Sequence, residues 1–126
     1  MGKRELIESF KNRSLRFIYE AEDDLNKGWY DFAVFHAEQS LQLALKALIT
    51  EKEGSYPLTH DLRKLIDILN KYHDLSFIQE RYSAEIDLLI QSYISSRYLP
   101  IDFNEGIAKK LILFVKEVLK RLGIWK

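Results

Sequence analysis

The chain has 126 residues, with 19 lysine and arginine residues against 19 aspartate and glutamate residues, so its formal net charge is zero. A length of this order forms one domain that buries a core without metals or disulfides. Zero net charge argues against a dedicated duplex-DNA binder, whose affinity comes from excess basic groups that release counterions. The absence of cysteine excludes disulfides, thiolate metal sites and a cysteine nucleophile.

No segment predicts export or membrane insertion. The N-terminus runs directly into an amphipathic pattern without the apolar centre of a signal peptide. No apolar run approaches the roughly 20 residues that span a bilayer. Together with the lack of cysteine, these features predict a cytoplasmic protein that does not enter a membrane.

Two long helices are predicted in the first half of the chain, where apolar residues recur every three or four positions. The first covers residues 5–27 and ends at Gly28. The second covers residues 30–52 and is apolar over a wide arc, which predicts the most buried helix. The expected buried stripes are Leu6, Phe10, Phe17, Ala21 and Leu25 on the first helix, and Ala33, Ala37, Leu41, Ala44, Leu45 and Leu48 on the second.

Three further helices are predicted in the second half. The third covers residues 60–72 with Thr59 as its N-cap, and a loose connection over residues 74–80 leads to the fourth, which ends near residue 97 or 98. Asp102 as N-cap and Glu105 as the N3 residue form a capping box for the fifth, which ends before Gly123. Residues 1–126 are therefore expected to form a single all-α domain, an antiparallel up-and-down bundle of about five helices.

Arg97 places a positive charge at the end of a helical stripe of apolar residues. Ile86, Leu89, Ile90, Tyr93 and Ile94 follow helical spacing, and the next turn of the same stripe ends on Arg97. A guanidinium cannot lose its proton, so on such a position it is ion-paired, extends to water, or holds an anionic ligand. Tyr93 and Tyr98 flank it and would either stack a base or belong to the core or a homodimer interface.

A partly polar strip on the second predicted helix offers further candidates. His36, Gln39 and Lys46 project along neighbouring angles and would line a cleft, or else Lys46 extends to solvent while Gln39 and His36 bond each other or the backbone. His60 begins the third helix, where it either helps to fix the turn or forms a wall of the same site. A neutral imidazole is expected there, because a helix N-terminus disfavours a cation.

Common catalytic and cofactor motifs are absent from the sequence. The three histidines show no HExxH or Glu-x-x-His spacing, so no metal ion is expected. There is no G-x-S-x-G and no glycine-rich phosphate loop, so no catalytic residue and no cofactor is assigned. Side chains would have to hold any bound nucleotide.

The order and spacing of five blocks resemble the HEPN family (higher eukaryotes and prokaryotes nucleotide-binding domain). These are AEDDL at residues 21–25, GWYDFA at 28–33, FHAEQSLQLALKAL at 35–48, THDLRKL at 59–65 and SRYLP at 96–100. The resemblance extends over about the whole chain. It implies a helical bundle, usually dimeric, and prokaryotic members are often encoded beside a minimal nucleotidyltransferase in toxin–antitoxin-like pairs.

The resemblance also implies a catalytic motif from which this chain departs. Many family members are metal-independent ribonucleases with an arginine followed, after four to six residues, by a histidine. After Arg97 the corresponding positions are Asp102, Phe103 and Asn104, so the expected general base or acid is missing. His60 would have to take its place in a rearranged site.

The favoured hypothesis is therefore a homodimeric binding protein that associates with a minimal nucleotidyltransferase or binds a nucleotide or RNA. Arg97 would contact the phosphate and Tyr98 and Tyr93 would shape the pocket. Lys46, Gln39 and His60 would form its walls. The alternatives are a metal-independent endoribonuclease with a degenerate or rearranged site, in which Arg97 stabilises the transition state, and a purely structural helical dimer.

Overall fold

The computed structural model describes residues 2–98 and 103–125, and for residues 95–98 it describes the backbone alone. Six helices lie in this part of the chain. They are α1 (Lys3–Asn26), α2 (Tyr30–Glu53), α3 (Leu62–Leu69), α4 (Ser76–Arg81), α5 (Ser83–Tyr98) and α6 (Glu105–Arg121). The all-α bundle predicted from the sequence is confirmed, with one helix more than expected.

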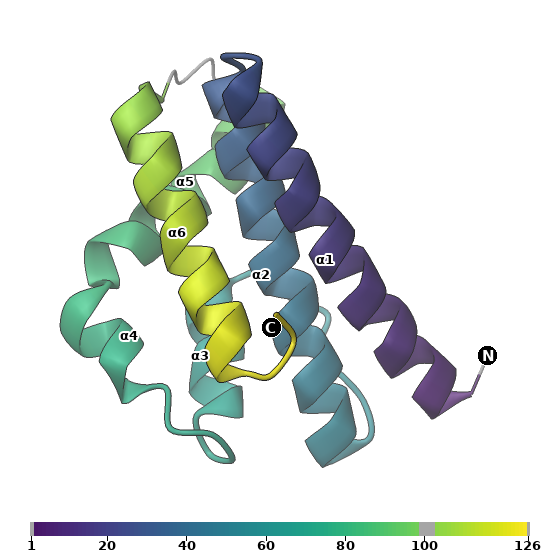
Figure 1. The fold of residues 1–126 in the computed structure, drawn as a ribbon. Coiled ribbons are helices and arrows are strands. Elements are labelled where there is room, and N and C mark those ends of the chain that lie inside the picture. The colour runs from purple at the N-terminus through teal and green to yellow at the C-terminus, as the bar shows by residue number, and fades with distance from the viewer. Residues whose placement is uncertain (1, 99–102, 126) are drawn as a thin grey trace.

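Helix α2 is the centre of the bundle. Figure 1 shows α1 and α2 running in opposite directions beside α6, and α2 also contacts α3 and α5. Ala33, Ala37, Ala44 and Ala47 on α2 are all fully buried, and their small side chains let neighbouring helices approach closely.

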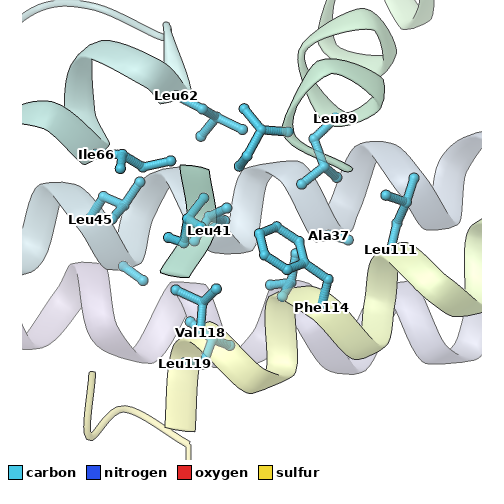
Figure 2. Packing of buried hydrophobic residues seen from close by; sticks show 14 of the residues in the cluster. Ala37, Leu41, Leu45, Leu62, Ile66, Leu89, Leu111, Phe114, Val118 and Leu119 are labelled. Carbon is cyan, nitrogen blue, oxygen red and sulfur yellow. The ribbon is translucent and has the colours of Figure 1, made fainter. Parts of the chain in front are cut away.

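The main hydrophobic core surrounds α2 on several sides. Figure 2 shows Ala37, Leu41 and Leu45 of α2 between residues of α3 and α5 on one side and residues of α6 on the other. The flanking side chains are Leu62 and Ile66 of α3, Leu89 of α5, and Leu111, Phe114, Val118 and Leu119 of α6. All six α2 residues predicted to be buried are buried, so the prediction for this helix is confirmed.

The ends of two helices differ from the predictions. Helix α3 begins at Leu62, and its N-cap is Asp61, whose side chain accepts a hydrogen bond from the Arg63 N–H; Thr59 instead accepts one from the Asp61 N–H. Helix α6 has Asn104 as its N-cap, accepting from the Ile107 N–H at 2.8 Å, so the prediction of Asp102 as N-cap was wrong. In both cases a polar side chain closer to the helix satisfies the free N–H groups.

Two stretches of the core differ from the predicted stripes. On α1, Phe10 and Ala21 are buried as predicted. The predicted Leu6, Phe17 and Leu25 are half-buried, and the residues next to them, Ile7, Ile18 and Asp24, are buried instead. On α5, Ile86 and Leu89 are buried as predicted, Ile90 and Tyr93 are half-buried, and Ile94 is 48% exposed. The residues expected to form a loose connection include α4, which packs Phe77 and Ile78 into the core.

No helix in the described part of the chain is both long enough and apolar enough to cross a membrane.

Candidate functional site

One face of α2 carries polar residues into the interior of the bundle. Phe35, Gln39, Gln42 and Lys46 recur at intervals of three or four residues and share one side of the helix, and Glu38 lies four residues before Gln42 on the same side. Glu38 is fully buried, Gln42 is 6% exposed, and Gln39 and Lys46 are half-buried. A buried carboxylate is costly unless hydrogen bonds compensate it.

Hydrogen bonds along this face compensate Glu38. Gln39 donates to one carboxylate oxygen at 2.8 Å, and Gln42 donates to the other at 3.0 Å. Gln42 then accepts a hydrogen bond from Lys46 Nζ at 3.1 Å. We call Glu38, Gln39, Gln42 and Lys46 the polar ladder; it holds a carboxylate and an ammonium in fixed positions along α2.

Lys46 ends the polar ladder in a partly desolvated position. Its Nζ lies 5.6 Å from the centre of the Tyr56 ring, within range of a cation–π interaction. Burial lowers the pKa of Lys46 below its ordinary value, and the negative charge of Glu38 opposes this shift only in part. Lys46 is thus held by its neighbours, in contrast to the alternative in which it extends to solvent.

Replacing Lys46 by methionine is expected to flatten the pH dependence of folding at alkaline pH. Between the lowered pKa of Lys46 in the folded chain and its ordinary value of 10.5, the unfolded chain holds a proton that the folded chain has released. The free energy of unfolding therefore rises with pH in this window, and Lys46→Met removes that rise. Urea unfolding at about pH 7 and about pH 10 measures the difference.

Lys52→Met, at an exposed position of the same helix, is the matched control for the loss of a lysine. A Lys46→Met chain that keeps the wild-type difference between the two pH values would show that the Lys46 ammonium is not desolvated.

Rings of the loop between α2 and α3 contact α1, α2 and α5. Near the Lys46 end, Tyr56 packs edge-on against Phe10 of α1, with ring centres 5.1 Å apart. At the other end, the His60 ring stacks on Tyr93 of α5 at 4.9 Å and an angle of 21°. Tyr93 also lies 6.4 Å from Phe35, so His60, Tyr93 and Phe35 form a row of rings beside the polar ladder.

The structure brings some of the predicted site residues together. Tyr93 and His60 are in contact, and Gln39 and Lys46 are joined through Glu38 and Gln42. The side chains of Arg97 and Tyr98 lie outside the described residues. Along the α5 backbone, residue 97 comes one turn after Tyr93, in the row that contains Ile90.

His36 is directed away from Gln39 and towards α1. Its Nδ1 lies 2.5 Å from a carboxylate oxygen of Asp24, so the alternative in which His36 and Gln39 bond each other is wrong. Glu20 of α1 also lies close to this pair. Sequence reasoning expected no metal ion because it considered spacing within one helix, whereas these three residues meet across α1 and α2.

Sequence reasoning also missed Glu38, Gln42 and Phe35 as members of the site. Their helical spacing with Lys46 was the available signal, but a glutamate on a helix usually faces solvent. Only the structure shows that Glu38 and Gln42 are buried in the bundle.

The comparison with protein families agrees with this architecture. Residues 7–125 match the family model of the HEPN domain. The chain belongs to the HEPN family. The resemblance seen in the sequence is therefore confirmed, and membership of the HEPN family links the chain to nucleotide- and RNA-related functions. No curated protein and no solved structure matches the chain.

Proposed function

We propose that this HEPN protein binds a nucleotide or single-stranded RNA without cleaving it. The observation that carries the proposal is the row of His60, Tyr93 and Phe35. Its middle ring, Tyr93, lies one helical turn before residue 97 on α5. His60 is exposed, so a base in solution can reach it. Stacking on rings of this kind contributes about 1–3 kcal/mol per base and tolerates any base.

Arg97 supplies the contact with phosphate in this proposal. A guanidinium forms two parallel charge-assisted hydrogen bonds with phosphate oxygens, and it remains charged at any physiological pH. Tyr98 follows it, and Gln39 and Lys46 of the polar ladder form further walls of the site. Since no histidine occupies residues 100–104, the proposal is binding and not ribose-directed cleavage.

Titration of the protein with a fluorescent nucleotide and with a labelled single-stranded RNA tests this function. Arg97→Ala is expected to weaken binding by about tenfold or more, because a hydrogen bond to a charged group contributes about 1.5–3 kcal/mol. Arg97→Lys keeps the charge but not the paired geometry, and it should recover only part of the affinity. Arg4→Ala, at an exposed position of α1, is the matched control.

Two results would contradict this function. One is the absence of binding to any nucleotide or RNA. The other is an Arg97→Ala chain that binds as the wild type does and only unfolds at lower temperature, which would support the purely structural dimer.

The homodimer and the nucleotidyltransferase partner are also part of the proposal, and they are supported by family membership. Exposed apolar side chains are available for such contacts, among them Trp29 (51% exposed), Phe32 (52%) and Leu113 (64%). Light scattering of the pure chain measures its oligomeric state, and co-purification with a minimal nucleotidyltransferase encoded beside it measures the pairing.

Metal-independent ribonuclease activity is the second candidate, and the position of His60 is the observation that favours it. His60 contacts α5 through Tyr93, one turn from Arg97, and is the imidazole that would take the place of the missing histidine. Cleavage of RNA in EDTA, lost in both Arg97→Ala and His60→Ala, would establish this activity and overturn the proposal of binding alone.

A further inference from the structure

A second cluster of ionisable side chains lies between α1 and α2, apart from the polar ladder. One ligand atom from each of Glu20, Asp24 and His36 lies within 4.8 Å of the other two. Glu20 and Asp24 are four residues apart on α1 and therefore project from the same side of the helix. His36 approaches them from α2, with Nδ1 2.5 Å from Asp24.

The His36 ring is held in one orientation by its neighbours. Phe17 of α1 and Phe32 of α2 lie at 5.7 Å and 6.4 Å from it, and each ring plane is within 21° of the imidazole plane. Phe35 packs against it at 5.6 Å. A ligand whose ring is already fixed loses little conformational freedom when it binds a metal ion.

The burial of the three side chains differs in a way that suits an ion entering from solvent. The Asp24 side chain is 6% exposed, the His36 side chain 19%, and Glu20 is exposed. Glu20 and Phe17 line a surface hollow of about 290 Å³ together with Arg13 and Arg16. Asp24 and His36 are thus the more buried members of the cluster, and Glu20 is its exposed member.

The charge of the cluster matches a divalent cation. The two carboxylates supply two negative charges, and like charges four residues apart on a helix repel each other. A cation between them removes this repulsion. Arg13 and Arg16 lie at the hollow with Glu20, and they are the positive groups with which such a cation would compete for this carboxylate.

We propose that Glu20, Asp24 and His36 bind a divalent first-row transition metal ion such as zinc. One imidazole nitrogen and two carboxylate oxygens are a ligand set for this class, whereas magnesium and calcium prefer oxygen ligands alone. Metal–ligand bonds of about 2.0–2.2 Å place ligand atoms roughly 3 Å apart, so small side-chain movements would bring these three into range. Water would complete the coordination.

Titration of the EDTA-dialysed protein with Co²⁺ tests the site, because the visible absorption of Co²⁺ reports nitrogen and oxygen coordination. Competition with Zn²⁺ then gives the zinc affinity. The expected result is one ion per chain. Glu20→Gln and His36→Gln should each weaken binding by at least about tenfold, as the loss of a ligand or its support does. Glu20 is exposed, so Glu20→Gln is not expected to disturb folding.

Two matched controls separate this site from ordinary surface binding. Asp23→Asn changes an exposed carboxylate next to Asp24, and His60→Gln removes an exposed imidazole elsewhere; both should bind Co²⁺ as the wild type does. Absence of a one-ion stoichiometry, or equal binding by Glu20→Gln and the wild type, would overturn the proposal and leave Asp24 and His36 as a structural hydrogen bond. RNA binding in EDTA is measured separately, so the two proposals can fail independently.

Discussion

Replacing Leu41 by alanine is expected to lower the free energy of unfolding by about 2–5 kcal/mol. Leu41 is fully buried at the middle of α2, where α3, α5 and α6 converge (Figure 2). Neighbours that pack on several sides cannot all move in to fill the space, so a cavity remains and adds to the lost burial. Because small domains are stable by only about 5–15 kcal/mol, this is a large fraction of the total.

Urea unfolding followed by circular dichroism measures the loss in the Leu41→Ala chain. Leu58→Ala, at a position 93% exposed, is the matched control and should change the free energy of unfolding by less than about 0.5 kcal/mol. Equal stability of the two variants would contradict a core organised around α2.

Replacing Glu38 by alanine should lower the free energy of unfolding by about 2–3 kcal/mol, because hydrogen bonds to charged groups contribute on this scale. Gln39 and Gln42 would lose the carboxylate that accepts their amide hydrogens, and Lys46 is bonded to the same Gln42. Glu38→Ala should therefore also weaken nucleotide or RNA binding, since the wall formed by Lys46 would no longer be fixed.

Glu51→Ala is the control for Glu38, because Glu51 is exposed on the same helix and forms a surface ion pair with Lys11 at 3.3 Å. Such pairs contribute about 0–1 kcal/mol. Unfolding in urea and RNA titration are run on both variants. If Glu38→Ala loses no more stability than Glu51→Ala, the polar ladder does not compensate a buried charge.

The buried apolar stripe of α2 could be predicted from the sequence because its alanines and leucines recur every three or four positions. The buried stripe of α1 was predicted only at Phe10 and Ala21, and two of its other buried residues are polar. Ser14 and Ser40 donate hydrogen bonds to each other's carbonyl oxygens at 2.7 Å and 2.8 Å, and Asp24 is buried against His36. Buried polar residues that form hydrogen bonds between two helices do not appear as apolar positions in the sequence, so the periodicity of apolar residues does not predict their burial.

The candidate site was predictable only in part for a similar reason. His60 and Tyr93 were identified as candidates, and the structure places them in contact. The sequence predicts Glu38 to face solvent, and its burial is known only from the structure. His36 was identified, but its partner Asp24 is 12 residues away on another helix, beyond any local spacing rule.

Whether Arg97 and the row of His60, Tyr93 and Phe35 form one site can be measured by the affinity for RNA. The dissociation constant of a labelled single-stranded RNA is determined for the wild type, Arg97→Ala, Tyr93→Leu and the double variant. Each single change is expected to weaken binding by about tenfold. The double change should be less severe than the product of the two, because residues that hold the same ligand are coupled. If the Arg97→Ala chain binds RNA with the wild-type affinity, Arg97 is not part of an RNA-binding site.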